Sequence, residues 1–379
     1  MNKDLGLVLS GGGARGAYQV GVIMAAQQIS HSSGVPLKFD YLSGVSAGAI
    51  NASSLASNAE NLHFATSELV RLWSEISFEK VFSTDSINMG KIGFQWFRDL
   101  SIGAMTGTTP GKSLMDTAPL RHLIHSNMNY EKVEENLRQG HFKGLAVTAI
   151  DYVQSATTTF IQGHKDISPW DKGRKRSEFT RITTDHIMAS SAIPLLFPPV
   201  KVGPRYFGDG AVRNHAPCSP VIYMGAQKIL IIGVRMQRAT AHEERAHQDQ
   251  MAPSVARVIN TVMNGVLLDA VEQDVDRLRR SNDLARMMSA EQRKMTSLRP
   301  VDYLLISPSA DIGEMAVQKA NKLPRMVRFL LKGLGSLQDA SELISYLLFD
   351  PEFCADLIEI GYKDGLAQKE ELLRLMDSK

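Results

Sequence analysis

The chain has 379 residues, 44% of them hydrophobic and 22% charged, a composition typical of folded proteins that excludes a disordered chain. Its 42 basic and 40 acidic side chains give a formal net charge of +2, so no global field favours nucleic acid as a partner. Two cysteines, Cys218 and Cys354, exclude a disulfide framework, and no apolar stretch is long enough for a signal sequence or a membrane span. We expect a cytoplasmic protein whose contact with membranes is local and peripheral.

The N-terminal part of the chain alternates strand and helix patterns. The aliphatic run 5–9 predicts a short buried strand, which leads through a glycine-rich turn into a segment with apolar residues at helical spacing. Residues 35–57 repeat this order, with a Gly-Ser turn and a helix of small residues. Residues 60–142 are expected to be mainly helical, with a Gly- and Thr-rich loop at 101–113.

Strand patterns return further along the chain. Residues 143–161 predict a hairpin, the polar and basic run 170–181 predicts a surface loop, and 228–234 predicts an aliphatic strand. Alternation of strands and helices favours an α/β fold with a largely parallel sheet. We divide the chain into an α/β domain over 5–235 and a mainly helical C-terminal extension over 236–379, packed on that domain, with one candidate strand near 302–308.

The sequence "GVSAG" places Ser46 between Gly44 and Gly48, the pattern of a nucleophile elbow. Flanking glycines permit the strained strand-to-helix turn that exposes the serine oxygen. A strand pattern precedes this motif and a small-residue helix follows it, as the mechanism requires. At the start of that helix, amides and the helix dipole stabilise negative charge. The alternative is a tight turn whose serine only caps the helix.

The loop "GGGARG" admits two interpretations. Gly11, Gly13 and Gly16 match the dinucleotide-binding fingerprint, which also needs an acidic residue about 20 positions on, and Asp40 is near that place. Alternatively, the backbone amides of this loop bind the oxyanion of an acyl-transfer intermediate. The serine motif favours the second interpretation.

A nucleophilic serine needs a base. Ten histidines keep a Ser-His-Asp triad open, with His186 and His215 near other notable residues, but none has a distinctive setting. Asp209 lies between Gly208 and Gly210 at the end of an apolar strand, although a simple Asp-Gly turn gives the same pattern. An isolated aspartate has a pKa near ~3.9, so this base would need partial burial to become effective at neutral pH.

Three ordered motifs carry a family resemblance: "GGGARG" at 11–16, "GVSAG" at 44–48 and "DGA" at 209–211, with "ASSAIPLLFPPV" upstream of the last. Together they resemble the patatin-like phospholipases over roughly residues 5–235. The resemblance implies a three-layer α/β/α sandwich around a mainly parallel sheet. The family most often has glycine where this chain has Ala211.

The resemblance also implies a reaction. It predicts a lipid acyl hydrolase of the phospholipase A or lysophospholipase type, with Ser46 and Asp209 as a catalytic dyad and an acyl-enzyme intermediate. The oxyanion hole is then formed by Gly11, Gly12, Gly13 and Ala14, and the supporting residues are Arg15, Gly16, Gly44, Gly48, Gly208 and Gly210. Neither a metal nor another cofactor is expected, and the substrate is a phospholipid or another fatty acyl ester. A catalytically silent lipid-binding or regulatory protein, and a general esterase with a triad, remain alternatives.

Several residues have roles that the sequence leaves open. Arg15 either fixes the glycine loop by bonding backbone carbonyls, the favoured role, or attracts a phosphate head group. Asn51 either braces the elbow or faces the core. Transient membrane contact is expected through the basic run 172–181 or the apolar, cationic segment 325–337, although a solvated loop and a helix packed on the core are the commoner explanations. The methionine-containing segment 284–298 is a candidate cover for an acyl channel.

Overall fold

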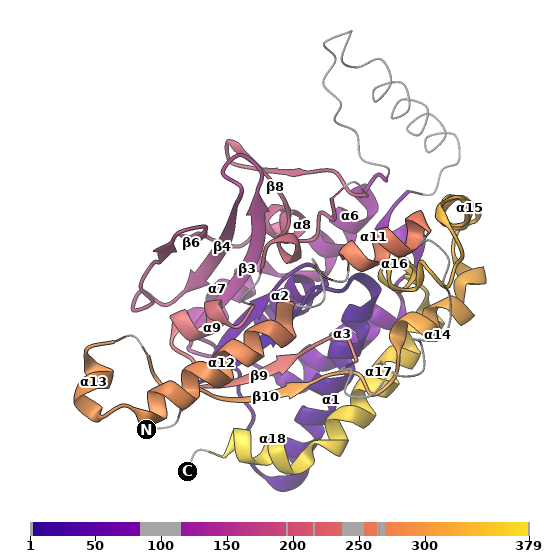
Figure 1. Ribbon diagram of the computed structural model, residues 1–379. Helices are drawn as coiled ribbons and strands as arrows, with labels where there is room; N and C mark the ends of the chain where they lie inside the picture. Colours follow the sequence, from indigo (N-terminus) through magenta and orange to yellow (C-terminus); the bar gives the residue numbers. More distant parts are fainter. Residues whose placement is uncertain are drawn as a thin grey trace.

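The computed structural model describes residues 3–83, 115–194, 196–214, 217–236, 254–263, 265, 270–296 and 298–377. The expected loop at 101–113 and His215 lie outside these residues. Figure 1 shows the arrangement of the elements, with helices on both faces of a central sheet. Among the described helices, none has the length and the apolar character that crossing a bilayer demands.

The described residues form one ten-stranded sheet, in which five neighbouring strands are parallel. Five strands run parallel in the order β10, β9, β1, β2, β3. Their bounds are β1 Leu5–Leu9, β2 Tyr41–Gly44, β3 Gly144–Asp151, β9 Lys228–Ile232 and β10 Asp302–Ile306. Strand β4 (Ala156–Gly163) pairs antiparallel with β3 over its whole length, which confirms the predicted hairpin.

Both faces of this sheet are buried, as parallel sheets require. Along β1, Leu7 and Leu9 belong to a core with α1 and α17, whereas Val8 belongs to a second core on the other face, together with Val221 and Leu278. The predicted layered α/β fold with helices in the C-terminal region is therefore confirmed. Because both faces are buried, strands such as β1 and β9 are apolar at almost every position.

Helices of the N-terminal half cover the sheet and build the site. They are α1 Gly16–Ser33, α2 Ala47–Ser57, α3 Leu62–Ser74, α4 Phe78–Val81, α6 Ala118–Asn127, α7 Tyr130–Arg138, α8 Thr184–Ser190 and α9 Ser219–Met224, with the 3-10 turns η1 Gly13–Arg15 and η2 Gly210–Val212. Side-chain caps fix several helix starts; Asn61, for example, accepts a hydrogen bond from the amide of Phe64.

The C-terminal half is mainly helical, and α17 packs along α1 (Figure 1). Its elements are α11 Val255–Met263, α12 Ala270–Met287, α13 Ala290–Lys294, α14 Ile312–Gln318, η4 Ala320–Lys322, α15 Arg325–Leu334, α16 Ser341–Leu347, α17 Pro351–Ala367 and α18 Lys369–Met376. Because β10 adds a parallel strand beside β9, this half is joined to the sheet as well as packed on it.

The prediction of a surface loop at 170–181 was wrong. Strands β5 (Asp171–Lys172) and β6 (Lys175–Phe179) form an edge hairpin, and β6 pairs parallel with β4. The open edge of β4 supplies backbone partners that the polar sequence does not reveal, and tertiary pairing overrides local propensity there. Two charges of the run are engaged within the protein: Arg176 pairs with Asp171 at 3.3 Å, and the Lys172 ammonium lies 4.2 Å from the centre of the Tyr223 ring.

Candidate active site

Ser46 lies at the turn between β2 and α2 in a strained backbone conformation. Its φ of 55° and ψ of −127° fall in a region that residues with a side chain rarely adopt. The flanking glycines make the turn sterically feasible: a Cβ at Gly44 would lie 2.2 Å from the Gly48 carbonyl oxygen, and one at Gly48 would lie 2.2 Å from the Leu9 oxygen. This is the backbone geometry of a nucleophile elbow.

The sheet brings Ser46 and Asp209 together along one edge of β3. Strand β2 occupies that edge up to Val147, which pairs with Gly44. Strand β8 (Arg205–Asp209) runs in the opposite direction on the same edge and ends at Asp209, which pairs with Ala149. The two strand ends therefore converge two positions apart on β3. Strand β7 (Val200–Val202) extends this part of the sheet beyond β8.

Asp209 is hydrogen-bonded and almost completely buried. Its side chain is 2% exposed and lies beside Ser46, and the Ala211 amide donates a hydrogen bond to Oδ1 at 2.8 Å. Burial raises the pKa of Asp209 to about 6, and the interactions with Ser46 and Ala211 only partly offset this effect. A carboxylate with a pKa closer to neutrality accepts a proton more readily than an ordinary aspartate.

Ser190 ties the elbow to β3, a connection that single residues of the sequence did not reveal. Its Oγ accepts a hydrogen bond from the Ser46 amide at 3.0 Å and donates one to the Thr148 carbonyl at 2.6 Å. Ser190 is fully buried at the end of α8, within the motif "ASSAIPLLFPPV". The motif was therefore a usable signal, but it did not say which serine makes the contact.

The glycine loop lies directly against Ser46 and the turn that follows Asp209. A Cβ added to Gly11 would lie 3.2 Å from the Cβ atoms of both Ser46 and Ala211. Among the described residues, the amides of Gly11, Gly12, Gly13 and Ala14 donate no hydrogen bond. The amide of Ala47 donates none either, and the sequence analysis did not single out this residue. Buried amides normally bind an acceptor, so this set suits an anionic oxygen held next to Ser46.

Arg15 holds the glycine loop in place through buried side-chain contacts. Its guanidinium donates from Nε to Ser345 Oγ at 2.8 Å and from Nη1 to the Val234 carbonyl at 3.1 Å, and it pairs with the Glu342 carboxylate. The side chain is fully buried, so the alternative in which Arg15 attracts a phosphate head group is wrong. The favoured structural role is the one its contacts describe.

Two of these partners, Glu342 and Ser345, lie on helix α16, more than 300 positions after Arg15 in the chain. Besides Glu342 and Ser345, this helix carries Tyr346, whose ring centre lies 5.6 Å from the Arg15 guanidinium. Gly13 has a φ of +55°, and a Cβ there would lie 2.2 Å from the Tyr346 carbonyl oxygen. The loop is thus held between the sheet and α16, and no local motif in the sequence pointed to α16.

An apolar pocket opens beside Ser46. It is narrow, with about 30 Å³ of free interior volume. Its lining is Gly13, Ser46, Ala47, Ile50, Leu72, Trp73, Ile76, Val81, Leu120, Leu123, Ser191, Ile193, Phe197 and Phe349. The described part of the segment 284–298 contributes no residue to it, because this segment forms the end of α12 and α13, so the expected methionine cover is not observed.

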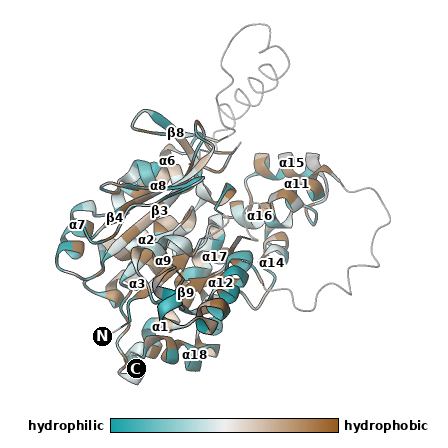
Figure 2. Ribbon diagram, turned by 60° about the vertical axis from the view of Figure 1, so that its left-hand side comes forward, coloured by the Kyte–Doolittle hydropathy of each residue, from teal (hydrophilic) through white to brown (hydrophobic). Residues whose placement is uncertain are grey.

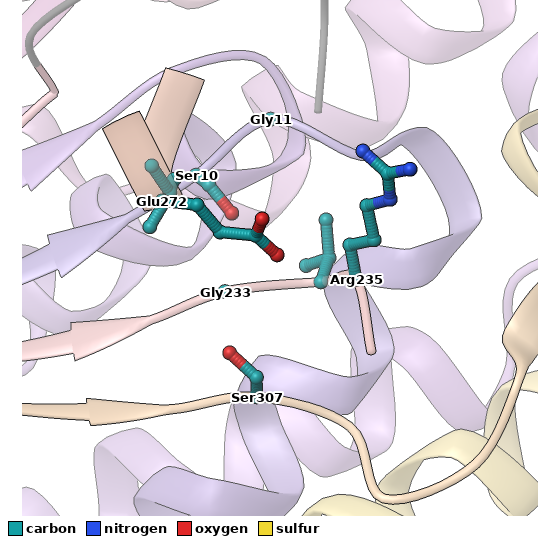
Figure 3. Close-up of a pocket in the computed structure, with 8 residues that line it drawn as sticks. Ser10, Gly11, Gly233, Arg235, Glu272 and Ser307 are labelled. Atoms are coloured by element: carbon teal, nitrogen blue, oxygen red, sulfur yellow. The ribbon is translucent and has the colours of Figure 1, made fainter. Parts of the chain in front are cut away.

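A second pocket lies where the start of the glycine loop meets the segments that follow β9 and β10 (Figure 3). Ser10 and Gly11 follow β1, Gly233 and Arg235 follow β9, Ser307 follows β10, and Glu272 approaches from α12. Neither Ser46 nor Asp209 lines it. The pocket therefore belongs to the ends of the neighbouring strands and does not include Ser46 or Asp209.

The structure contradicts the dinucleotide interpretation. Asp40 Oδ2 accepts a hydrogen bond from the Leu5 amide at 3.0 Å, at the start of β1. The glycine loop follows the other end of that strand, so Asp40 lies at the wrong edge of the sheet to bind a ribose next to the loop.

Asn51 braces the elbow: its side chain donates a hydrogen bond to the Gly16 carbonyl at 3.0 Å and accepts one from Trp73 Nε1 at 2.7 Å.

Among the described residues, no histidine is hydrogen-bonded to Ser46 or Asp209. His186 is buried in the first turn of α8, where its Nδ1 accepts a hydrogen bond from the Thr183 amide at 3.1 Å. Burial lowers the pKa of His186. This residue therefore has a capping role.

The chain belongs to the patatin-like phospholipase family, which its sequence matches over residues 7–222, more than half of its length. Membership assigns it to a family of lipid acyl hydrolases. The comparison with curated proteins gave no significant match.

Solved structures that are similar to the chain include the following two. VipD from Legionella pneumophila is 14% identical, with a TM-score of 0.33, and the match covers 99% of this chain and 67% of VipD. Human GIVD cytosolic phospholipase A2, in complex with methyl gamma-linolenyl fluorophosphonate, is 12% identical, with a TM-score of 0.42. That match covers 99% of this chain and 59% of the human protein, so this chain spans well under two thirds of the human protein.

Proposed function

We propose that this protein hydrolyses fatty acyl esters of lipids through a dyad of Ser46 and Asp209. The observation that carries the proposal is the position of Ser46 beside the buried Asp209 carboxylate, next to loop amides that bind no acceptor within the described protein. The family supports lipid hydrolysis in general. The dyad and the substrate type are specific to this proposal.

The reaction proceeds in two steps. Ser46 Oγ attacks the ester carbonyl while Asp209 accepts the hydroxyl proton, and the loop amides bind the oxyanion. Collapse breaks the ester bond, and Asp209 returns the proton to the departing alcohol. A water molecule then gives its proton to Asp209 and attacks the acyl-enzyme, and collapse releases the fatty acid while Asp209 returns that proton to Ser46 Oγ.

The pocket suits the acyl part of such a substrate. Its side chains are almost all aliphatic or aromatic, and Ser46 lies in its wall. Entry of an acyl chain requires this narrow pocket to widen; once inside, the chain is shielded from water and its ester carbonyl lies beside the serine. Phospholipase A or lysophospholipase activity follows, with transient contact with a membrane surface from which the substrate is drawn.

Labelling with a fluorophosphonate and hydrolysis of a mixed phospholipid panel, read by mass spectrometry, test the proposal. We expect both to disappear in Ser46→Ala and to persist in Ser53→Ala, a control that removes a buried hydroxyl from the same helix. Hydrolysis is expected to disappear in Asp209→Asn. An active Asp209→Asn, together with a folded His→Ala variant that has lost turnover, would establish a triad instead. Absence of labelling in the native chain would favour a lipid-binding protein without turnover.

A further inference from the structure

Helix α15 exposes an aromatic side chain between two cations. Val327 and Leu331, four positions apart, are buried against the core, whereas Phe329 is 71% exposed. Arg325 and Lys332 are exposed at four positions before and three positions after Phe329, so all three lie on the helix face opposite the buried one. A helix that buries one apolar face normally turns polar residues outward, and Phe329 departs from that rule.

The neighbouring helix α11 exposes an aliphatic stripe. Val255, Val258 and Val262 are 59%, 50% and 59% exposed, and their spacing of three and then four residues puts them on one face. Helices α11 and α15 are in contact and lie side by side in both views (Figures 1 and 2). We call the exposed residues Val255, Val258, Val262, Arg325, Phe329 and Lys332 the α11–α15 face.

The charge of this face is uniformly positive. The sequences of α11 and α15 hold Arg257, Arg325, Arg328 and Lys332 and no acidic residue, although the chain as a whole has nearly as many acids as bases. Among the described residues, Arg325 and Lys332 form no salt bridge, whereas Arg257 pairs with Asp339. The basic run 172–181 is different, because Lys172 and Arg176 are engaged within the protein.

Helix α16 connects the face to the candidate active site. It contacts both α11 and η1 of the glycine loop, and Phe349, just after it, lines the pocket beside Ser46. We propose that the α11–α15 face docks the protein on bilayers of anionic phospholipid, with Phe329 and the three valines in the interfacial region and the cations on lipid phosphates. The proposal rests on the proposed function, since a lipid hydrolase must reach its substrate at a bilayer.

Co-sedimentation with vesicles tests this docking without any hydrolysis, if the full chain carries Ser46→Ala. We expect binding to phosphatidylcholine vesicles that contain phosphatidylserine and much weaker binding to pure phosphatidylcholine. Arg325→Gln with Lys332→Gln is expected to weaken binding roughly 25-fold, because each cation near an anionic surface changes the binding constant about fivefold. Phe329→Glu is expected to weaken it by about tenfold or more.

Helix α12 offers matched controls. It exposes Met287, at 85%, and the cations Arg279 and Arg286, but it also carries four acidic residues and lies apart from α15 in both views. We expect Met287→Glu, and Arg279→Gln with Arg286→Gln, to bind vesicles like the parent. Equal binding by the α12 and α15 variants would overturn the proposal.

Two further outcomes would also overturn the proposal. One is that the parent binds neither vesicle; the other is that light scattering shows a dimer which Phe329→Glu abolishes, since the face would then join two copies of this chain. Vesicle binding without lipid hydrolysis by the native chain would refute the proposed function alone.

Discussion

Replacing Asp209 with asparagine should stabilise the protein above pH 6 while it abolishes hydrolysis. Burial raises the pKa of Asp209 from 3.8 to about 6 in the folded protein. Between these two values the folded chain keeps a proton that the unfolded chain has lost, so the native protein loses stability as pH rises through this window. A pKa difference of one corresponds to about 1.4 kcal/mol, so the loss amounts to about 3 kcal/mol above pH 6. Asparagine stays neutral and avoids it.

Urea unfolding of the native chain and of Asp209→Asn, at a series of pH values, measures this effect. The difference in unfolding free energy should change in favour of the variant by about 3 kcal/mol between pH 3.5 and pH 7.5, with most of the change between pH 4 and 6. Other titrating groups cancel in the difference. A difference that stays flat with pH, or that moves toward the native chain, would refute the idea that burial holds Asp209 near neutrality.

Glu60→Gln provides a control of opposite sign. Burial raises the pKa of Glu60, but hydrogen bonds from Lys132 and Asn136 outweigh burial and lower it overall. The folded chain therefore loses this proton at lower pH than the unfolded chain, and the ionised form stabilises the native state at neutral pH. The Gln variant should lose stability relative to the native chain as pH rises, the reverse of Asp209→Asn.

Three further predictions concern turnover. kcat/KM should fall about tenfold per pH unit below an acid limb near pH 6, because the base must be ionised; a limb near pH 4 in a pH–rate profile would contradict the raised pKa of Asp209. Glu342→Ala should cost about 3–5 kcal/mol in urea unfolding by leaving the Arg15 charge buried and unpaired, and should lower kcat more than it changes KM; Glu342→Gln should recover part of both. Gly13→Ala should abolish turnover in a chain that still folds by circular dichroism, because its Cβ would meet the Tyr346 carbonyl; full activity would show that the loop conformation is unimportant.

The local parts of the site could be predicted from the sequence, and the long-range parts could not. The turn at Ser46 depends on neighbours within a few positions, so strand, glycine and small-residue patterns were enough to indicate it. Asp209 has a weaker local signal, and only the order of three motifs distinguished it from an ordinary turn. The pairing of Arg15 with Glu342 joins positions 327 apart, and a glutamate on an amphipathic helix looks like any solvated charge until its burial is known.

The geometry of the candidate site has a cost that the rest of the fold must offset. A serine at positive φ costs about 1–3 kcal/mol, and the buried Asp209 carboxylate adds a similar amount at neutral pH. Both residues stay in place because β2 and β8 are hydrogen-bonded to the same edge of β3, and because Ser190 links that strand to the Ser46 amide. The glycine loop depends in turn on α16. The strained turn at Ser46 lies near the N-terminus, whereas α16, which holds the glycine loop, lies near the C-terminus. Packing of the C-terminal helices and the geometry at Ser46 therefore form one cooperative unit.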